Sequence, residues 1–163
     1  MELTTRTVEV GLNEAGRFVD DCWKQIPTHF PRVILDEYKI MPNHVHGIIM
    51  IEGNVGVQNL EPLQKSLREP THETPENKFQ HIIPNSMGSI VRGFKIGVTK
   101  WFRQNTRVHV VWQRNFYEHI IRNDDSLNRI REYIMYNPIR WAADRDNPNG
   151  NPDETEIKFW KNL

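Results

Sequence analysis

Cysteine is almost absent from this chain of 163 residues, which contains Cys22 alone. One cysteine excludes a disulfide within the chain and excludes a zinc site built from cysteine pairs. Cys22 falls among apolar residues at helical spacing, so we interpret it as a packing residue. The first residues, Met-Glu-Leu-Thr-Thr-Arg, lack the apolar segment of a secretory signal. These absences indicate a reducing, cytoplasmic compartment.

Long apolar runs and net charge are absent as well. The longest apolar run, Gly47 to Ile51, is too short to cross a bilayer, so we expect no membrane partner. The formal net charge is zero, but residues 78–145 hold 12 Lys/Arg against 5 Asp/Glu, a balance of +7. A basic half favours an anionic partner, with nucleic acid as the first candidate. An ordinary solvated surface explains the same charges equally well.

The apolar pattern alternates between helical and strand periods along the chain. Helices are expected from Asn13 to about Pro27, over about 86–104 and from about 123 to 137, and strands over 33–40, about 45–52 and 107–112. Pro42 and Asn43 form a short break between the first two strands, which favours an antiparallel pair.

We expect one domain over residues 1–145, a size that allows a sizeable core. Residues 53–84 are rich in Glu, Gln, Asn, Pro and Thr and are interpreted as a mobile insertion. Residues 146–163 form a polar C-terminal tail, in which Phe159 and Trp160 are candidates for docking back on the domain.

Two histidines flank Val45 in a segment that otherwise has the pattern of a buried strand. Successive side chains of a strand point to opposite faces, so His44 and His46 share a face while Val45 points into the core. Two neighbouring imidazoles can bind one divalent metal through neutral nitrogens. A pair of histidines satisfied by other groups is the alternative, and it stays open at this point.

The last predicted helix carries a second polar group at the edge of its apolar stripe. Tyr133 lies beside the stripe, Asn137 follows one turn later on the same side, and Tyr136 points to the opposite side. Tyr133 as an aromatic at the core edge and Asn137 as a helix cap before Pro138 are the structural alternatives.

Three motifs together resemble a known family. They are Met41-Pro42-Asn43-His44-Val45-His46, then Trp112-Gln113 with Phe116-Tyr117-Glu118-His119-Ile120-Ile121-Arg122, then Tyr133-Ile134-x-x-Asn137-Pro138-x-Arg140. In this order they are similar to the single-tyrosine HUH transposases, in particular the REP-associated tyrosine transposases. The likeness runs from about Leu12 to Arg140.

The resemblance implies an α+β fold, a ferredoxin-like antiparallel sheet with helices mainly on one face. It implies that His44, His46 and Asn137 are ligands of Mg²⁺ or Mn²⁺ and that Tyr133 is the nucleophile. The implied reaction cleaves and rejoins single-stranded DNA that carries a hairpin, through a 5′-phosphotyrosine intermediate. No general base for Tyr133 is evident from the sequence.

Seven cations are candidates for DNA contact, because aromatic side chains between cations suit single-stranded nucleic acid. They are Arg92, Lys95, Lys100 and Arg103 in one predicted helix, and Arg114, Arg122 and Arg140 beyond it. A monomer and a homodimer are both compatible with the family.

One departure concerns the N-terminal end. Members of the family begin with a further strand of the sheet ahead of the segment that starts at Leu12, and this chain begins just before that segment. Three alternatives follow: the chain is a truncated copy that lacks this strand, its N-terminus is misassigned, or residues 7–10 replace the strand in part. The alternative function is an N-terminally truncated, catalytically inactive DNA-binding relative. A metal-dependent hydrolase of another substrate is a third option without specific support.

Overall fold

An antiparallel β-hairpin lies between two groups of helices in the computed structural model, which describes residues 11–53, 83–114 and 116–163. The elements are α1 (Glu14–Lys24), α2 (Ile26–His29), β1 (Val33–Ile40), β2 (Val45–Ile51), α3 (Met87–Asn105), α4 (Asp124–Tyr136), a 3₁₀ turn (Trp141–Ala143) and α5 (Glu154–Lys161). The predicted α+β class is confirmed.

The two strands form the predicted antiparallel pair, with an irregularity in β1 between Leu35 and Tyr38. β1 and β2 pair antiparallel from Val33 opposite Ile51 to Ile40 opposite Val45. The Met41 amide donates a hydrogen bond of 2.9 Å to the His44 carbonyl, which closes a tight turn around Pro42 and Asn43. This turn places His44 directly before β2.

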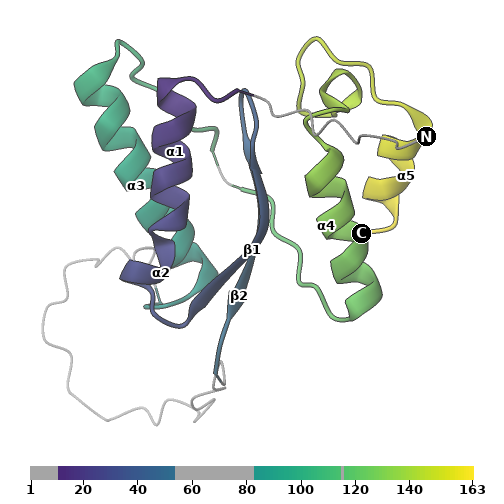
Figure 1. The fold of residues 1–163 in the computed structure, drawn as a ribbon, viewed down its shortest axis with the longest axis horizontal. Helices are drawn as coiled ribbons and strands as arrows, with labels where there is room; N and C mark the ends of the chain where they lie inside the picture. The colour runs from purple at the N-terminus through teal and green to yellow at the C-terminus, as the bar shows by residue number, and fades with distance from the viewer. Residues whose placement is uncertain (1–10, 54–82, 115) are drawn as a thin grey trace, which may run out of the picture.

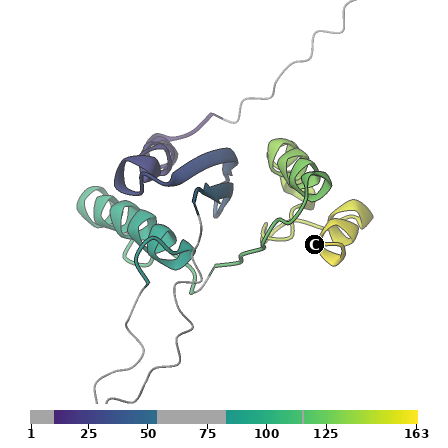
Figure 2. The ribbon, with the colours of Figure 1, turned by 90° about the horizontal axis from the view of Figure 1, so that it is seen from below.

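Helices α1 and α3 lie side by side on one face of the hairpin (Figures 1 and 2). The main core forms there from buried residues of both helices, of the start of α2 and of β1: Val19, Trp23, Ile26, Val33, Ile90, Phe94 and Val98. Val45 packs against this core, as predicted. Gly47 of β2 is required here, because a Cβ atom at this position would overlap the Trp23 indole.

Helix α4 packs on the other face of the hairpin, and α5 lies outside α4 (Figures 1 and 2). Ile134 of α4 and Ile48 of β2 are buried. The Arg131 guanidinium of α4 binds both carboxylate oxygens of Asp36 in β1, with Nε 2.9 Å from Oδ1. This ion pair fixes the helix that carries Tyr133 against the strand pair.

The predicted helix starts are confirmed by their caps. The side chains of Asn13, Ser86 and Asn123 each accept a hydrogen bond from the backbone N–H three residues later. Such caps satisfy N–H groups that the first turn of a helix leaves without partners. Pro27, where the first helix was expected to end, lies in the first turn of the short helix α2.

The strand expected over residues 107–112 is wrong, because this segment is irregular and pairs with neither strand of the described hairpin. Its alternation puts Val108 and Val110 on one side, and both are exposed, Val110 by 84%. The next two residues, Val111 and Trp112, pack against the core. Trp112 Nε1 also donates a 3.1 Å hydrogen bond to the Lys95 carbonyl, so α3 and not a partner strand holds this end of the segment.

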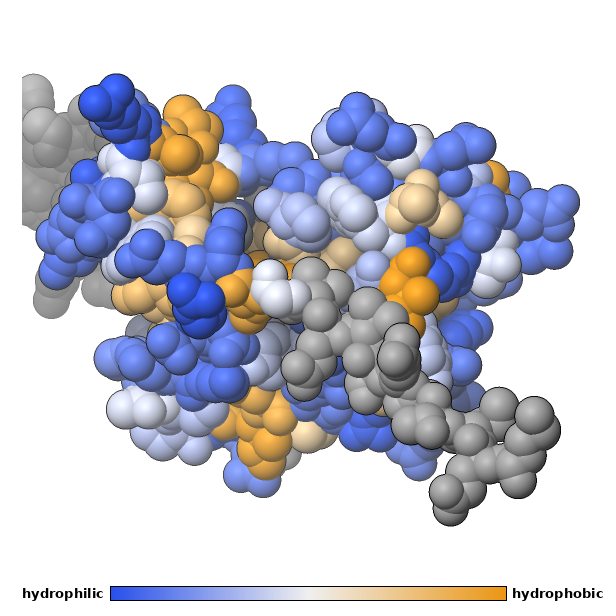
Figure 3. Space-filling model, turned by 45° about the horizontal axis from the view of Figure 1, so that its top comes forward, coloured by the Kyte–Doolittle hydropathy of each residue, from blue (hydrophilic) through white to orange (hydrophobic). Residues whose placement is uncertain are grey.

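The expectations about a first strand at residues 7–10 and about a mobile insertion fall on residues 1–10 and 54–82, outside the described residues. Within the described ranges, no helix is long and apolar enough to cross a membrane. On the face drawn in Figure 3, hydrophobic residues form small separate areas within a largely hydrophilic surface.

Candidate functional site

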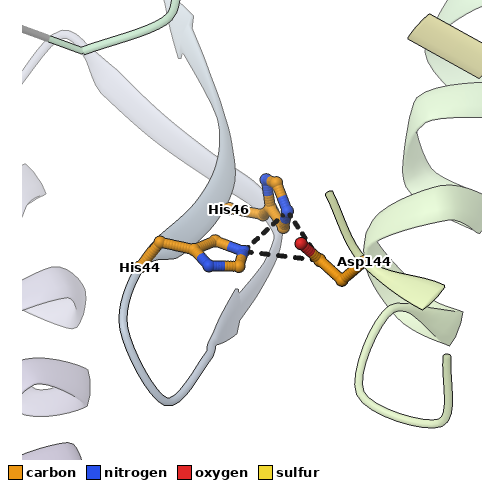
Figure 4. Close-up of side chains that lie close together, drawn as sticks. All are labelled: His44, His46 and Asp144. Carbon is orange, nitrogen blue, oxygen red and sulfur yellow. Dashed lines mark hydrogen bonds and ion pairs between the residues drawn. The ribbon is translucent and has the colours of Figure 1, made fainter. Parts of the chain in front are cut away.

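The two histidine rings lie together on the face of the hairpin that α4 covers. Their Nε2 atoms are 2.9 Å apart and their ring centroids 4.4 Å (Figure 4). The prediction that His44 and His46 share a face is confirmed. The two nitrogens point toward the loop that follows α4, where a third polar side chain meets them.

That third side chain is Asp144, which the sequence analysis did not select. Its Oδ2 atom lies 3.7 Å from His44 Nε2 and 3.9 Å from His46 Nε2 (Figure 4). Asp144 is only 1% exposed and directly follows the 3₁₀ turn Trp141–Ala143. One ligand atom from each of the three residues lies within 4.8 Å of the other two, a spacing that could hold a metal ion.

The protonation of this cluster favours a cation. Burial and the neighbouring His46 lower the pKa of His44 to about 4, against the opposing charges of Asp144 and Asp146. Burial by itself would raise the pKa of Asp144. The neighbouring His46 side chain and the hydrogen bonds from the Asn137 amide and the Asp146 N–H instead hold that pKa at about 2. At neutral pH the site therefore offers a neutral imidazole and a carboxylate, the forms that bind metals.

Asn43 sets the orientation of the His44 ring. Its amide nitrogen donates a 2.7 Å hydrogen bond to the Asp146 carbonyl, so its oxygen faces His44 Nδ1 at 2.8 Å. Because an amide oxygen only accepts, His44 must carry its proton on Nδ1. The lone pair of Nε2 is then directed at His46 and Asp144.

Asn137, the ligand implied by the resemblance, lies in the same cluster. It is 2% exposed, and its amide nitrogen donates a 2.6 Å hydrogen bond to Asp144 Oδ2. Its amide oxygen is buried and has no hydrogen-bond partner among the described residues. A buried acceptor without a partner is costly. A cation beside it would satisfy this oxygen.

The donor set fits a divalent metal. Two imidazole nitrogens and one carboxylate oxygen converge. The Asn137 amide nitrogen binds that carboxylate, and the amide oxygen of the same buried side chain is unpaired among the described residues. Mixed nitrogen and oxygen ligands suit several divalent ions, and oxygen donors are those that Mg²⁺ and Mn²⁺ prefer. The residues alone do not select one ion.

Tyr133 lies next to the histidines, within the same chain. Its ring centroid is 5.4 Å from that of His46, in an edge-to-face arrangement. Burial and a 2.9 Å hydrogen bond from its hydroxyl to Glu156 raise the pKa of Tyr133, so the phenol is protonated at neutral pH. Tyr136 is 49% exposed, more than Tyr133, as predicted.

Helix α5 covers the outer side of Tyr133. The Phe159 ring stacks on the Tyr133 ring at 3.9 Å between centroids, and Trp160 meets it edge-on at 5.8 Å. The expected docking of Phe159 and Trp160 on the domain is confirmed. Glu156 was not predicted as a site residue, although the spacing from Asp153 to Glu156 is that of a helix-capping box, and Asp153 caps α5.

Four of the predicted DNA-contacting cations gather on the outer side of α3. Arg92, Lys95, Lys100 and Arg103 line one groove of about 650 Å³, together with Phe116. The Lys95 ammonium lies 5.8 Å from the Phe116 ring centroid and 5.5 Å from that of Trp112. The groove belongs to the helix layer on the opposite face of the hairpin from α4.

The other three cations are not part of this groove. Arg114 and Arg122 are exposed in the irregular segment between α3 and α4. Arg140 forms an ion pair of 2.8 Å with Asp153. It lines a second cavity of about 480 Å³ between α4 and α5, which Tyr133, Tyr136 and Asn137 also line.

Two known proteins of Haemophilus influenzae are similar to the chain. An uncharacterized protein is 48% identical over 139 residues, which cover 84% of this chain and 72% of that protein. A "Putative REP-associated tyrosine transposase" is 47% identical over 38 residues, 23% of this chain and 22% of that protein. No protein-family model and no solved structure matches the chain. By the long match, the chain belongs to the same family as the uncharacterized Haemophilus influenzae protein.

Proposed function

We propose that this protein cleaves and rejoins single-stranded DNA with Tyr133 as nucleophile, next to a divalent metal held by His44, His46 and Asp144. The observation that carries the proposal is the approach of the Tyr133 ring to His46, at 5.4 Å, beside three convergent metal-binding side chains. The 38-residue similarity to a protein named as a tyrosine transposase supports the same reading.

The proposed metal ligands are His44 Nε2, His46 Nε2 and a carboxylate oxygen of Asp144. The Asn137 amide nitrogen holds that carboxylate, and its unpaired oxygen is the candidate for a further donor. Mg²⁺ or Mn²⁺ is the proposed ion, and when bound it would polarise the scissile phosphate and stabilise the charge that develops there. The protein's part is to keep His44 neutral, Asp144 ionised and the Asn137 oxygen available.

Tyr133 forms the covalent link. Its hydroxyl oxygen attacks phosphorus, a new bond joins that oxygen to phosphorus, and the bond to the 3′ oxygen of the preceding nucleotide breaks. One fragment leaves with a free 3′-OH, and the other stays attached by its 5′ phosphate. The 3′-OH can later reverse the step, so rejoining needs no further energy source. Tyr133 and His46 belong to one chain, so this site needs no second copy.

The DNA strand has two surfaces available. The α3 groove offers four cations and Phe116, which suits phosphates and a stacked base. Because α3 and α4 lie on opposite faces of the hairpin, this groove anchors the folded DNA away from the reacting phosphate. The cavity lined by Tyr133, Asn137 and Arg140 receives the strand that is cut.

Covalent capture tests the proposal. The probe is a pool of single strands with one fixed hairpin flanked by randomised nucleotides, labelled at the 3′ end and incubated with the protein and Mn²⁺. The expected result is a labelled protein band that survives denaturing electrophoresis. A 5′-labelled pool should instead give shortened strands, because only the 3′ fragment becomes attached.

Two variants sharpen this experiment. Tyr133→Phe should form no adduct, whereas Tyr38→Phe, which removes a hydroxyl that binds Asp20 of α1 outside the cavity that Tyr133 lines, should form the normal amount. An adduct that persists in Tyr133→Phe contradicts the nucleophile assignment. Salt-sensitive binding of the hairpin pool without any adduct points to a non-catalytic DNA-binding protein.

A further inference from the structure

A buried carboxylate touches the oxygen that would react. Glu156 is 2% exposed, and its Oε1 atom accepts a 2.9 Å hydrogen bond from the Tyr133 hydroxyl. The same oxygen accepts a 2.8 Å bond from Trp160 Nε1. A buried carboxylate needs hydrogen-bond donors such as these. The same contact gives the Tyr133 hydroxyl an acceptor to which it can transfer its proton.

The position of Glu156 is fixed by contacts on both sides of α5. Asp153 caps the helix through the Glu156 amide at 2.9 Å and also pairs with Arg140, just beyond α4. Phe159 stacks on Tyr133, and the Arg145 guanidinium lies 3.9 Å from the Trp160 ring centroid. The carboxylate is therefore held at one distance from the phenol, as a proton acceptor must be.

The hydrogen bond also leaves the phenol oxygen able to attack. Tyrosine has a single hydroxyl proton, and here that proton lies between the phenol oxygen and Glu156 Oε1. The lone pairs of the phenol oxygen are free of that bond. A protonated tyrosine is a weak nucleophile, so attack on phosphorus needs a group that removes the proton during the step.

We propose that Glu156 is the general base for Tyr133, a role that rests on the proposed function. As the Tyr133 oxygen bonds to phosphorus, its proton passes to Glu156 Oε1, and the leaving 3′ oxygen takes a proton from water. In rejoining, the 3′-OH loses its proton to water and attacks phosphorus, and Glu156 returns its proton to the departing Tyr133 oxygen. Charge and protons balance in both directions.

A different role is possible for the same contact: Glu156 and Phe159 could simply hold the phenol away from DNA. The two roles predict opposite effects of removing the base. Glu156→Gln keeps an oxygen that can accept from Tyr133 and Trp160 but cannot take up the proton. If Glu156 is the general base, its replacement slows adduct formation. If Glu156 only holds the phenol away from DNA, its replacement leaves the rate unchanged or raises it.

The experiment measures the rate of adduct formation at saturating hairpin pool and Mn²⁺. Glu156→Gln should be about 10²-fold to 10⁴-fold slower than the wild type. Hairpin binding and Mn²⁺ affinity should stay at wild-type values. The matched control is Glu154→Gln, the same change at a side chain of α5 that is 89% exposed, and it should react at the wild-type rate.

A second measurement separates proton transfer from a packing defect. A fluorinated tyrosine at position 133 is more acidic and depends less on a base, so it should speed up Glu156→Gln much more than it speeds up the wild type. Equal effects in both backgrounds, or a Glu156→Gln rate at or above the wild-type rate, would overturn the assignment while the proposed function stands. A wild-type protein that forms no adduct overturns both.

Discussion

The side-chain amide of Asn43 donates a hydrogen bond of 2.7 Å to the backbone carbonyl of Asp146, 103 positions later in the chain. This bond joins the hairpin turn to the loop that carries Asp144. The other end of the same amide accepts from His44 Nδ1 at 2.8 Å. One side chain therefore aligns two of the three metal-binding residues.

Removing this side chain should weaken metal binding without unfolding the protein. Asn43→Ala frees the His44 ring to rotate and to change its tautomer, and we expect Mn²⁺ affinity to fall about 10-fold to 100-fold. Titration calorimetry with Mn²⁺ measures this. Asn105→Ala, at the exposed end of α3, serves as control and should bind normally. An unchanged affinity in Asn43→Ala would show that the turn does not orient His44.

Asp144 should contribute more to metal binding than Asn137. Asp144→Asn removes the one negative charge among the three convergent ligands and should lower Mn²⁺ affinity by more than about 100-fold, beyond the effect of groups that only orient a ligand. Asn137→Ala should cost less, because the two histidines and Asp144 remain. Equal losses in the two variants would favour the amide as an equal ligand, and no loss in Asp144→Asn would exclude Asp144 from the site.

The Asp36–Arg131 pair should make stability depend on pH. The hydrogen bond from Arg131 lowers the pKa of Asp36, against burial and together with the Glu37 amide. The folded pKa therefore lies below the unfolded value of about 3.9. The stabilisation is fully present above the unfolded pKa and is lost as the pH falls through the folded pKa.

Denaturant unfolding of the wild type and Asp36→Asn measures this dependence. At neutral pH the variant should be less stable by about 1 kcal/mol. The gap should close as the pH falls below about 4. Asp21→Asn, at an exposed aspartate of α1, should show no such gap. A gap that persists in acid would mean that packing and not charge joins α4 to β1.

The α3 groove should set the salt dependence of DNA binding. Each phosphate contact on a single strand contributes a slope of about 0.7 to the fall of log affinity with log salt. Arg92→Gln and Lys100→Gln should each weaken hairpin binding and reduce the slope by about that amount. Lys24→Gln on α1, outside the groove, should leave both unchanged. If the salt slope is unchanged in Arg92→Gln and Lys100→Gln, the DNA does not bind in the α3 groove.

Much of the fold and part of the site could be predicted from the sequence, because both follow from periodicity. The alternation of β2 places His44 and His46 on one face, and the helical period places Tyr133 and Asn137 on one side of α4. The chain from 137 to 153 contains no such period. Asp144 follows a 3₁₀ turn, where residue spacing does not predict which way a side chain points. Its contact with the histidines therefore could not be predicted from the sequence.

The sequence contains a weak pattern that predicts the last helix, α5. Residues 146–163 are polar in composition, yet Asp153 and Glu156 have capping-box spacing and Phe159 and Trp160 follow at helical intervals. The strand expected at 107–112 failed for the opposite reason: Val108 and Val110 alternate correctly but find no partner in the described hairpin. Periodicity predicts which side chains share a face, but the neighbour on that face is a tertiary property.

The proposed reaction links Tyr133 to DNA beside the histidine and aspartate cluster. Peptide mapping by mass spectrometry of the protein captured with the hairpin pool and Mn²⁺ tests it most directly. We predict a nucleotide joined through phosphate to the peptide that contains Tyr133, and its loss in His46→Ala or without Mn²⁺. A nucleotide on any other residue, or on Tyr133 regardless of metal, would show that Tyr133 is not a metal-dependent nucleophile.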